Sequence, residues 1–504
     1  MNEIYKTKAE EIVPKLFERK VDAKRCVYFE KDEKAPFSTK VVDVPEIKEV
    51  FQKGDSITLD FGEHLVGKLS FKMESVQGHI GEPIRLKFRF GEIPMELTRD
   101  FSTYDGWISG SWLQEEIVNV DFPETVTLPR RYCFRFMEVT VLETVQKVKL
   151  SDFSVMHITS ADTENAEKVT IIDEELAEID RVSAKTLEDC MQSVYEDGPK
   201  RDRRLWSGDF RLQALSDYYL FKNYDLVKRC LYLFAACLTD GKYLPSCLYY
   251  YPELWSKKGS GFMDYAFLYT VAVGEYFEHS KDVNTVRELF PIVKSQMDIA
   301  IDNLSDGILT IPEDSNGFID WADDLKKILP THGVFLYALE KNIELAKSLG
   351  ETDVADKWEE TLTKSRKAAY ELFFDGEKFV NPKEDNQYAV HNQVWMILGG
   401  VTGEDEGRMV LGKAFLSKDS IKPVSPYMHH YVLEAMIKLN MFDEAKAYIK
   451  DYWGGMIKLG ADTFWEVYVP GDLAVSPYRD ALINSFCHAW SCTPSYFIRK
   501  YLNK

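Results

Sequence analysis

The stretch ADTENAEKVTIIDEELAEIDRV, residues 161–182, marks the point where the hydrophobic period of the chain changes. From here on, apolar residues recur three or four positions apart, as at Ile179, Val182 and Leu187, and this spacing returns in segment after segment up to the C-terminus. Such spacing is typical of helices that bury one face. We therefore expect the chain after this point to be mainly helical.

The residues before this stretch follow a period of two. Ile57, Leu59 and Phe61 alternate with polar residues, and the segments 69–73 and 84–90 show the same alternation, which indicates half-buried strands. Glycines separate these segments at short intervals that leave no room for a helical crossover. The sequence therefore predicts an N-terminal antiparallel β-sandwich over residues 1–158 and an all-α domain over residues 159–504.

The helical part divides into segments that follow one another in pairs. Roughly a dozen helices in sequential pairs indicate helical hairpins closed into a ring, the (α/α)6 toroid, and no repeat at a fixed interval points to a solenoid instead. The expected helices cover residues 209–222, 224–239, 263–279, 284–303, 332–349, 353–373, 390–400, 405–417, 427–440, 442–451 and 478–502.

Composition and charge narrow the class of protein. The chain has 82 acidic and 62 basic residues, a formal net charge of −20, which disfavours binding to nucleic acid or to anionic lipid. No apolar run is long enough to cross a membrane, and the first twenty residues contain no signal-peptide core. The eight cysteines include no CxxC pair, so we expect reduced thiols and a cytoplasmic protein.

Three loops combine tryptophan with acidic residues beside glycine. They are EDGPKRDRRLWSGD at 196–209, GFIDWADD at 317–324 and GADTFWE at 460–466. Indole faces stack on sugar rings and charged groups bind hydroxyls, so this mixture favours a sugar-active enzyme over three merely solvated loops. A toroid that binds carbohydrate without catalysis is the alternative. The histidines form no metal-binding pattern, and we expect neither a metal nor another cofactor.

With further motifs, these loops resemble the bacterial α-L-rhamnosidases of glycoside hydrolase family 78. The resemblance also covers DFG…VGKL at 60–69, SPYMHHYVLEAM at 425–436 and FCHAWSCTPSYF at 486–497. It implies an (α/α)6 catalytic toroid after a β-sandwich, and an inverting enzyme that removes terminal α-L-rhamnose from small glycosides. Many family members carry a further C-terminal β-sandwich, and we expect a compact form without it.

The resemblance assigns site residues by position. The family's general base is the Glu of a GAxTFWE motif, which matches Glu466, and its sugar-binding positions match Asp197, Arg201, Trp206, Asp209, Trp321 and His488.

The general acid aligns with Asp202. Arg201 and Trp206 are five residues apart, as in the shorter form of the family motif, in which the acid directly follows the arginine. Arg203 then stands where the longer form has Glu. A general acid must hold a proton, which the arginines at 201, 203 and 204 would oppose unless their side chains point away.

Two alternatives stay open at this point. Because of Arg203, the toroid could be catalytically inactive, and a six-hairpin glycosidase could act on another deoxy sugar or on a uronic acid. We also expect a homodimer, with SCLYYYPELW at 246–255 as a candidate patch for a partner subunit or for the rim of the substrate funnel.

Overall fold

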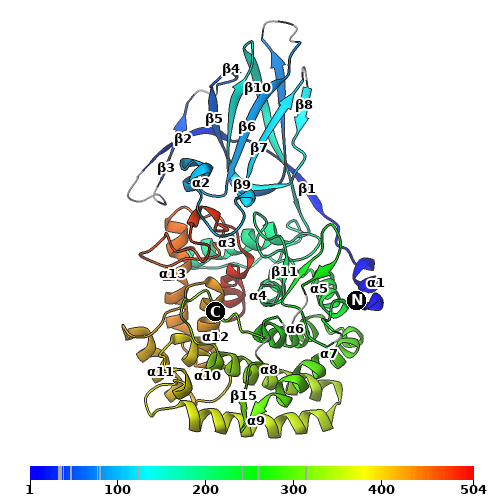
Figure 1. Cartoon of the computed structure of the whole chain (residues 1–504), viewed down its shortest axis with the longest axis vertical. Helices are drawn as coiled ribbons and strands as arrows, with labels where there is room; N and C mark the ends of the chain where they lie inside the picture. Colours follow the sequence, from blue (N-terminus) through cyan, green and yellow to red (C-terminus); the bar gives the residue numbers. More distant parts are fainter. Residues whose placement is uncertain are drawn as a thin grey trace.

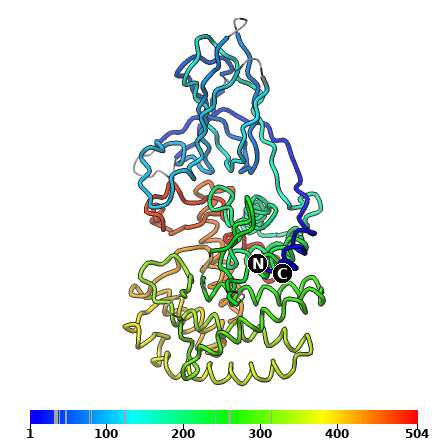
Figure 2. Tube along the Cα trace, turned by 45° about the vertical axis from the view of Figure 1, so that its right-hand side comes forward, coloured from blue at the N-terminus to red at the C-terminus, as the bar shows by residue number. Residues whose placement is uncertain are grey.

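The computed structural model has an antiparallel β domain standing on a helical domain (Figures 1 and 2). It describes residues 1–31, 37, 39–45, 48–76, 78, 81–121, 124–240, 242–257, 261–312 and 315–503. None of the helices within these residues is long and apolar enough to cross a membrane. The two domains and their order agree with the expected fold.

Among its described residues, the β domain has ten strands that pair antiparallel with one another. They are β1 (Phe17–Asp22), β2 (Arg25–Glu30), β3 (Lys40–Val44), β4 (Val50–Phe51), β5 (Ser56–Ser75), β6 (Ile84–Gly91), β7 (Glu115–Val120), β8 (Glu124–Thr127), β9 (Tyr132–Glu143) and β10 (Val148–Thr159).

Strand β5 connects two groups of strands. Its first part pairs with β2 and β9, for example Leu59 with Met137, and its second part pairs with β8 and β10, for example Met73 with Leu150. The alternating apolar side chains of the strands form one buried cluster, which includes Phe71. In the segments 57–61, 69–73 and 84–90, the period of two in the sequence thus places every second side chain in this cluster.

Most of the expected helices are confirmed, with ends that differ by up to seven residues. They are α4 (Ser207–Asp217), α5 (Tyr224–Ala236), α6 (Met263–Ser280), α7 (Val283–Asp302), α8 (Ile328–Leu349), α9 (Thr352–Phe373), α10 (Val390–Leu398), α11 (Glu404–Leu416), α12 (Pro426–Lys438) and α13 (Phe442–Lys458). The first periodic segment forms α3 (Glu174–Cys190), whose N-cap Asp173 accepts a hydrogen bond from the backbone N–H of Leu176. A short N-terminal helix, α1 (Glu3–Glu11), packs against α5.

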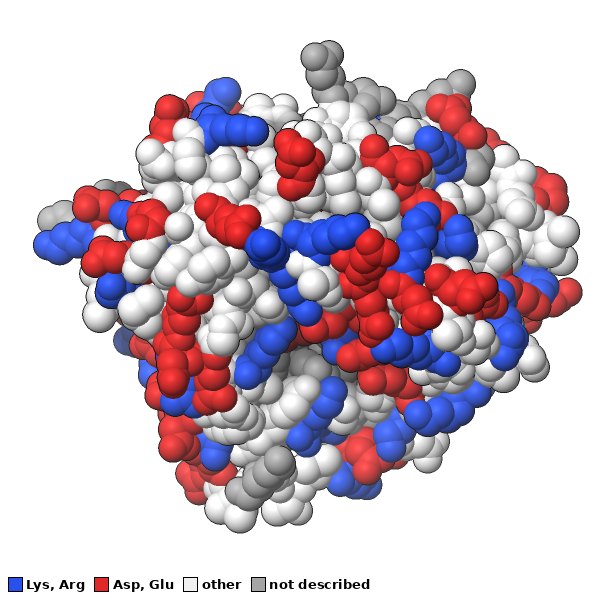
Figure 3. Space-filling model, turned by 90° about the horizontal axis from the view of Figure 1, so that it is seen from below, with Lys and Arg blue, Asp and Glu red and all other residues white. Residues whose placement is uncertain are grey.

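The helices form a closed ring of hairpins. Helices α4, α6, α8, α10 and α12 pack in this order as an inner layer, and α5, α7, α9, α11 and α13 pack against them from outside. The C-terminal segment closes the ring between α12 and α4. The loops between the helices contain short strands: β11 (Leu205–Trp206), β12 (Cys247–Tyr249), β13 (Trp255–Ser256), β14 (Leu304–Ser305) and β15 (Ile308–Leu309). Acidic and basic side chains intermingle on the face seen in Figure 3.

The expected helix over residues 478–502 is wrong for most of its length. Only α14 (Pro494–Phe497) and a π-helical turn at Ile498–Leu502 are helical beyond short 3-10 turns. The backbone of this segment bonds to other segments instead: Ser485 accepts from the N–H of Glu466 at 2.9 Å, and the N–H of His488 donates to Phe464 at 2.9 Å. These bonds occupy groups that a helix would need. His488 therefore lies in extended backbone.

Candidate active site

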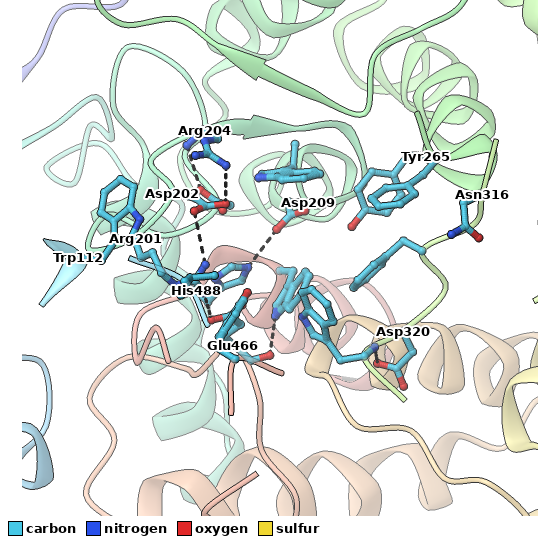
Figure 4. Close-up of a pocket in the computed structure, with 18 of the residues that line it drawn as sticks. Trp112, Arg201, Asp202, Arg204, Asp209, Tyr265, Asn316, Asp320, Glu466 and His488 are labelled. Atoms are coloured by element: carbon cyan, nitrogen blue, oxygen red, sulfur yellow. Dashed lines mark hydrogen bonds and ion pairs between the residues drawn. The ribbon is translucent and has the colours of Figure 1, made fainter. Parts of the chain in front are cut away.

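All eight residues predicted from the sequence line one cavity of about 530 Å³ between the two domains (Figure 4). They come from three places in the fold. The loop between α3 and α4 and the first turn of α4 supply five of them, the loop before α8 supplies one, and the segment after α13 supplies two. These residues are Asp197, Arg201, Asp202, Trp206 and Asp209, then Trp321, then Glu466 and His488.

Glu466 is buried and held by three donors. Its Oε1 accepts from the hydroxyl of Tyr478 at 2.6 Å, and its Oε2 accepts from the guanidinium of Arg201 and from the N–H of Ser485 at 3.1 Å. Burial alone would raise the pKa of Glu466, but Arg201, His488 and these hydrogen bonds lower it to about 2. The carboxylate is therefore charged at neutral pH.

Arg201 links the two carboxyl groups assigned to catalysis. One end of its guanidinium bonds to Glu466, and its other terminal nitrogen lies 3.5 Å from Oδ1 of Asp202. The guanidinium also lies over the ring of Tyr478, 4.2 Å from its centroid. A single cation thus spans the space between Asp202 and Glu466.

Asp202 lies in a tight turn, with left-handed backbone at Asp202 (φ +63°) and Arg203 (φ +52°). The turn sends the side chain of Arg203 away from the cavity, where it donates to the carbonyl groups of Pro199 at 2.7 Å and Arg131 at 3.1 Å. Arg204 stays at the site and donates to Oδ2 of Asp202 at 3.0 Å. Of the three arginines next to Asp202 in the sequence, only Arg203 points away from its carboxyl group.

Two further carboxyl groups lie deeper in the cavity wall. Burial, with the nearby carboxylates of Asp202 and Asp209, raises the pKa of Asp197 well above its ordinary value. Burial also raises the pKa of Asp209, although His488 Nε2, 3.2 Å from its Oδ1, acts in the opposite direction. Protonated carboxyl groups can donate as well as accept hydrogen bonds. The cavity therefore offers both kinds of partner to a hydroxyl group.

Aromatic rings form another wall. The ring of Trp206 lies edge-on to Tyr265, and the ring of Trp321 lies edge-on to Phe318 with centroids 5.1 Å apart. Nε1 of Trp321 and Nδ1 of His488 are buried without a hydrogen-bond partner among the described residues. A buried polar atom without a partner costs free energy, so both atoms favour a ligand that carries hydroxyl groups.

The loop that presents Trp321 is fixed by buried carboxylates on either side. Ile319 has φ +56°, a strained conformation for a β-branched residue. Asp264 accepts from the N–H groups of Phe318 and Ile319, and Asp320 accepts from the hydroxyl of Ser425 at 2.5 Å. These bonds hold the strained backbone in place.

Several lining residues are not among those predicted from the sequence. Tyr478 lies in the segment 478–502, where a helix was expected, and Trp107, Ile108 and Trp112 belong to the β domain, in which no site residue was expected. The stretch DGWISGSW at 105–112 has the same mixture of tryptophan, acid and glycine as the three loops, so the signal was present. Other missed residues that line the cavity are Arg204, Phe262, Tyr265, Asn316, Phe318, Asp320, Lys327 and Trp490.

The aromatic stretch 246–255 does not line the cavity. Tyr249 lies beneath the guanidinium of Arg204 at 4.4 Å and so supports a lining residue from behind. Tyr251 and Trp255 are exposed. Some His, Cys and carboxylate side chains lie close enough together to hold a metal ion. Among the described residues, these groups lie around His64 and His157 at the domain junction, and none of them is in the cavity.

Comparisons with known proteins place the chain in a family. Residues 23–160 match the glycosyl hydrolase family 78 alpha-rhamnosidase N-terminal domain, and residues 166–502 match the bacterial alpha-L-rhamnosidase 6 hairpin glycosidase domain. A rhamnosidase from Klebsiella oxytoca, solved with rhamnose bound, is 34% identical, has a TM-score of 0.95, and the match covers 99% of both chains. No curated protein matched the chain.

More distant structures share the fold. The family 78 rhamnosidase of Bacillus sp. GL1 is 22% identical with a TM-score of 0.76, over 92% of this chain and 49% of that one. An α-L-rhamnosidase of Streptomyces avermitilis, complexed with L-rhamnose, is 15% identical with a TM-score of 0.69, over 97% of this chain and 44% of that one. The chain thus spans about half the length of these two structures. The matches to both family models and to the Klebsiella structure show that the chain belongs to the bacterial α-L-rhamnosidases of glycoside hydrolase family 78.

Proposed function

We propose that this protein is an inverting exo-glycosidase that removes terminal α-L-rhamnose from small glycosides, with Asp202 as general acid and Glu466 as general base. The observation that carries the proposal is a charged, buried Glu466 in the same cavity as Asp202, with one guanidinium between them. The Klebsiella rhamnosidase with bound rhamnose, similar over nearly the full length, supports the sugar.

Glu466 has room for one more hydrogen bond. A carboxylate offers about four lone-pair positions, and three of them accept from Tyr478, Arg201 and Ser485. The remaining position, on Oε1, can accept from a water molecule and orient it towards the anomeric carbon. In an inverting enzyme that water attacks while the acid protonates the departing oxygen.

Asp202 suits the acid because of its place in the cavity. Its side chain is 18% exposed, whereas that of Glu466 is 2% exposed, so Asp202 lies nearer to the opening through which a leaving group departs. The alternative donor is Asp197, whose raised pKa keeps a proton on a carboxyl group close to Asp202.

The lining favours a neutral deoxy sugar over a uronic acid. The aromatic wall can pack against an apolar methyl group and ring face, and the unpartnered nitrogens of His488 and Trp321 can bind hydroxyl groups. A uronate would add a negative charge to a cavity whose two arginines, Arg201 and Arg204, already bond to the carboxyl groups of Glu466 and Asp202.

A panel of aryl glycosides tests the substrate. Among p-nitrophenyl glycosides of rhamnose, fucose, glucose and glucuronic acid, the α-L-rhamnoside should have the highest kcat/KM. Preference for another sugar would contradict the substrate and leave the fold untouched. Binding of rhamnose without turnover of any glycoside would instead support the carbohydrate-binding alternative.

Three further proposals concern the whole molecule. The chain divides into domains at residues 158 and 159, close to the end of β10. The eight free thiols support a cytoplasmic location, and the exposed rings of Tyr251 and Trp255 support a homodimer. Light scattering at micromolar protein tests the dimer, since a monomeric mass would contradict it.

A further inference from the structure

A loop of the β domain forms part of the cavity wall. Between β6 and β7 the chain makes a short helix, α2 (Pro94–Thr98), and two 3-10 turns, and Trp107, Ile108 and Trp112 from this loop line the cavity. The expected function assigned none of the three a role. We call residues 105–112 the tryptophan loop.

The tryptophan loop is fixed to the segment that carries Tyr478. Six residues before the loop, Arg99 forms a two-bond ion pair with Asp480 at 2.6 and 2.9 Å. The backbone N–H of Trp107 donates to Tyr478 at 3.2 Å, and its indole N–H donates to Pro477 at 2.8 Å. Since Tyr478 bonds to Glu466, the loop has a defined position relative to the base.

The tight path of the loop depends on glycine. A Cβ on Gly106 would lie 2.2 Å from the hydroxyl oxygen of Tyr104, and that hydroxyl donates to the carbonyl of Ile108 at 3.0 Å. The ring of Tyr104 thus fills the space beneath the loop. A preformed surface loses little conformational entropy when a ligand binds.

The exposed surface of the loop is apolar. Trp107 is 61% exposed although both of its N–H groups are bonded, so its indole offers a ring face and no free donor. Ile108 adds apolar surface. A sugar placed there would lose water from its hydroxyl groups without gaining partners from these two side chains, whereas a flat aromatic ring would not.

The loop lies on the side of the cavity where a leaving group departs. Figure 4 shows Trp112 at the end of the cavity with Arg201 and Asp202, while Tyr265 and Asn316 lie at the other end. If Asp202 protonates the glycosidic oxygen, the leaving group must lie on its side. On the basis of the proposed function, we propose that Trp107, Ile108 and Trp112 form the leaving-group subsite, and that it takes a planar aromatic aglycone.

The test compares rhamnosides whose alcohols are similarly poor leaving groups. The substrates are benzyl α-L-rhamnoside, methyl α-L-rhamnoside and a rhamnosyl-(1→6)-glucoside. The benzyl compound should have a kcat/KM about threefold to tenfold above the methyl compound, the size of one ring-stacking contact. Trp107→Ala and Trp112→Ala should each reduce this ratio towards one, whereas Trp→Phe at either position should retain most of it.

A matched control comes from the same domain. Tyr28, on β2, is 49% exposed and does not line the cavity, so Tyr28→Ala should leave the ratio unchanged. Equal losses on the benzyl and methyl compounds would overturn the proposal, as would an unchanged ratio in both alanine variants. A preference for the rhamnosyl-glucoside that the alanine variants abolish would assign the subsite to a sugar instead. Failure of the wild-type enzyme on every rhamnoside would reject the proposed function itself.

Discussion

The hydroxyl of Tyr478 donates a 2.6 Å hydrogen bond to the carboxylate of Glu466, and the backbone carbonyl of the same tyrosine accepts from Trp107 of the β domain. The residue proposed as general base is therefore supported from both domains. Tyr478 acts here as a positioning residue, because it touches the base and not the reacting atoms.

Tyr478→Phe should shift the pH profile of catalysis. Glu466 has a pKa of about 2, lowered from 4.5, so in the wild type its protonation does not limit the rate above pH 4. Loss of the donor destabilises the charged form, so the pKa rises and an acidic limb moves to higher pH. A hydrogen bond to a charged group is worth about 1.5–3 kcal/mol, so we expect the acidic limb to move up by about one to two pH units. At pH 3 kcat/KM should fall up to about tenfold, whereas at pH 7, where Glu466 stays charged, the pKa change has little effect. The profile of kcat/KM from pH 3 to 7 measures this.

Tyr104→Phe is the control for that experiment. Tyr104 lies in the neighbouring loop and donates to Ile108, not to Glu466, so its removal should leave the acidic limb where it is. Superimposable profiles of Tyr478→Phe and wild type would contradict the positioning role.

Glu466→Gln should abolish activity and change the pH dependence of stability. The amide cannot take a proton from water, so the rate should fall at least about 100-fold. It also takes from buried Arg201 the nearer of its two carboxyl partners, so we expect a loss of about 1–3 kcal/mol in the free energy of unfolding at pH 7. Because the pKa of Glu466 is depressed in the folded state, its contribution is present above pH 4.5 and is lost as the pH falls towards 2.

Denaturant unfolding at pH 7 and pH 3 tests whether the contribution of Glu466 to stability decreases at low pH. The stability difference between wild type and Glu466→Gln should narrow at pH 3. A difference of the same size at both pH values would show that the carboxylate is not charged against Arg201 in the folded protein.

Asp202→Asn should slow poor leaving groups far more than good ones. An alkyl rhamnoside needs protonation of its departing oxygen, so the loss should be about 100-fold, whereas an activated aryl rhamnoside should lose much less. Arg203→Ala should leave this leaving-group dependence unchanged, because the Arg203 side chain bonds to Pro199 and Arg131 outside the cavity. If Asp197→Asn, and not Asp202→Asn, shows the selective loss, then Asp197 is the acid.

The first-formed sugar should be the β anomer of rhamnose. Attack by water held on Glu466, opposite to the leaving group, inverts the configuration and requires carboxyl groups about 6.5–9.5 Å apart, against about 5–5.5 Å for a retaining pair. Proton NMR during the first turnovers measures the anomer before mutarotation. The α anomer appearing first would exclude single displacement.

Lys200→Met should destabilise the junction between the domains. Lys200, buried in the helical domain, bonds to Glu92 and Glu96 of the β domain at 2.9 and 2.8 Å. Removing one partner of a buried ion pair costs about 3–5 kcal/mol. Lys364→Met removes an exposed pair with Glu360 and should cost at most about 1 kcal/mol. Equal shifts of Tm in the two variants would contradict the prediction that the buried ion pairs of Lys200 stabilise the protein more than the exposed pair of Lys364.

That the eight candidate residues lie in one cavity could be predicted because the family motifs keep their order along the chain, and the toroid brings their loops together. The helix over 478–502 could not be excluded, since Leu482, Ile483 and Phe486 are buried by contacts from other segments rather than by helical period. The outward turn of Arg203 depends on two consecutive left-handed residues, which the sequence does not reveal. Trp107 reaches the site only through contacts between residues far apart in the chain.

The Arg99–Asp480 ion pair and the hydrogen bonds of Trp107 to Pro477 and Tyr478 limit how the two domains can be exchanged. A β domain transplanted from another protein would bring a different loop to the cavity and remove a support of the base. The β domain is therefore not an interchangeable module for engineering. A chimaera that alters aglycone preference would have to take the tryptophan loop and the segment 476–480 from the same parent protein.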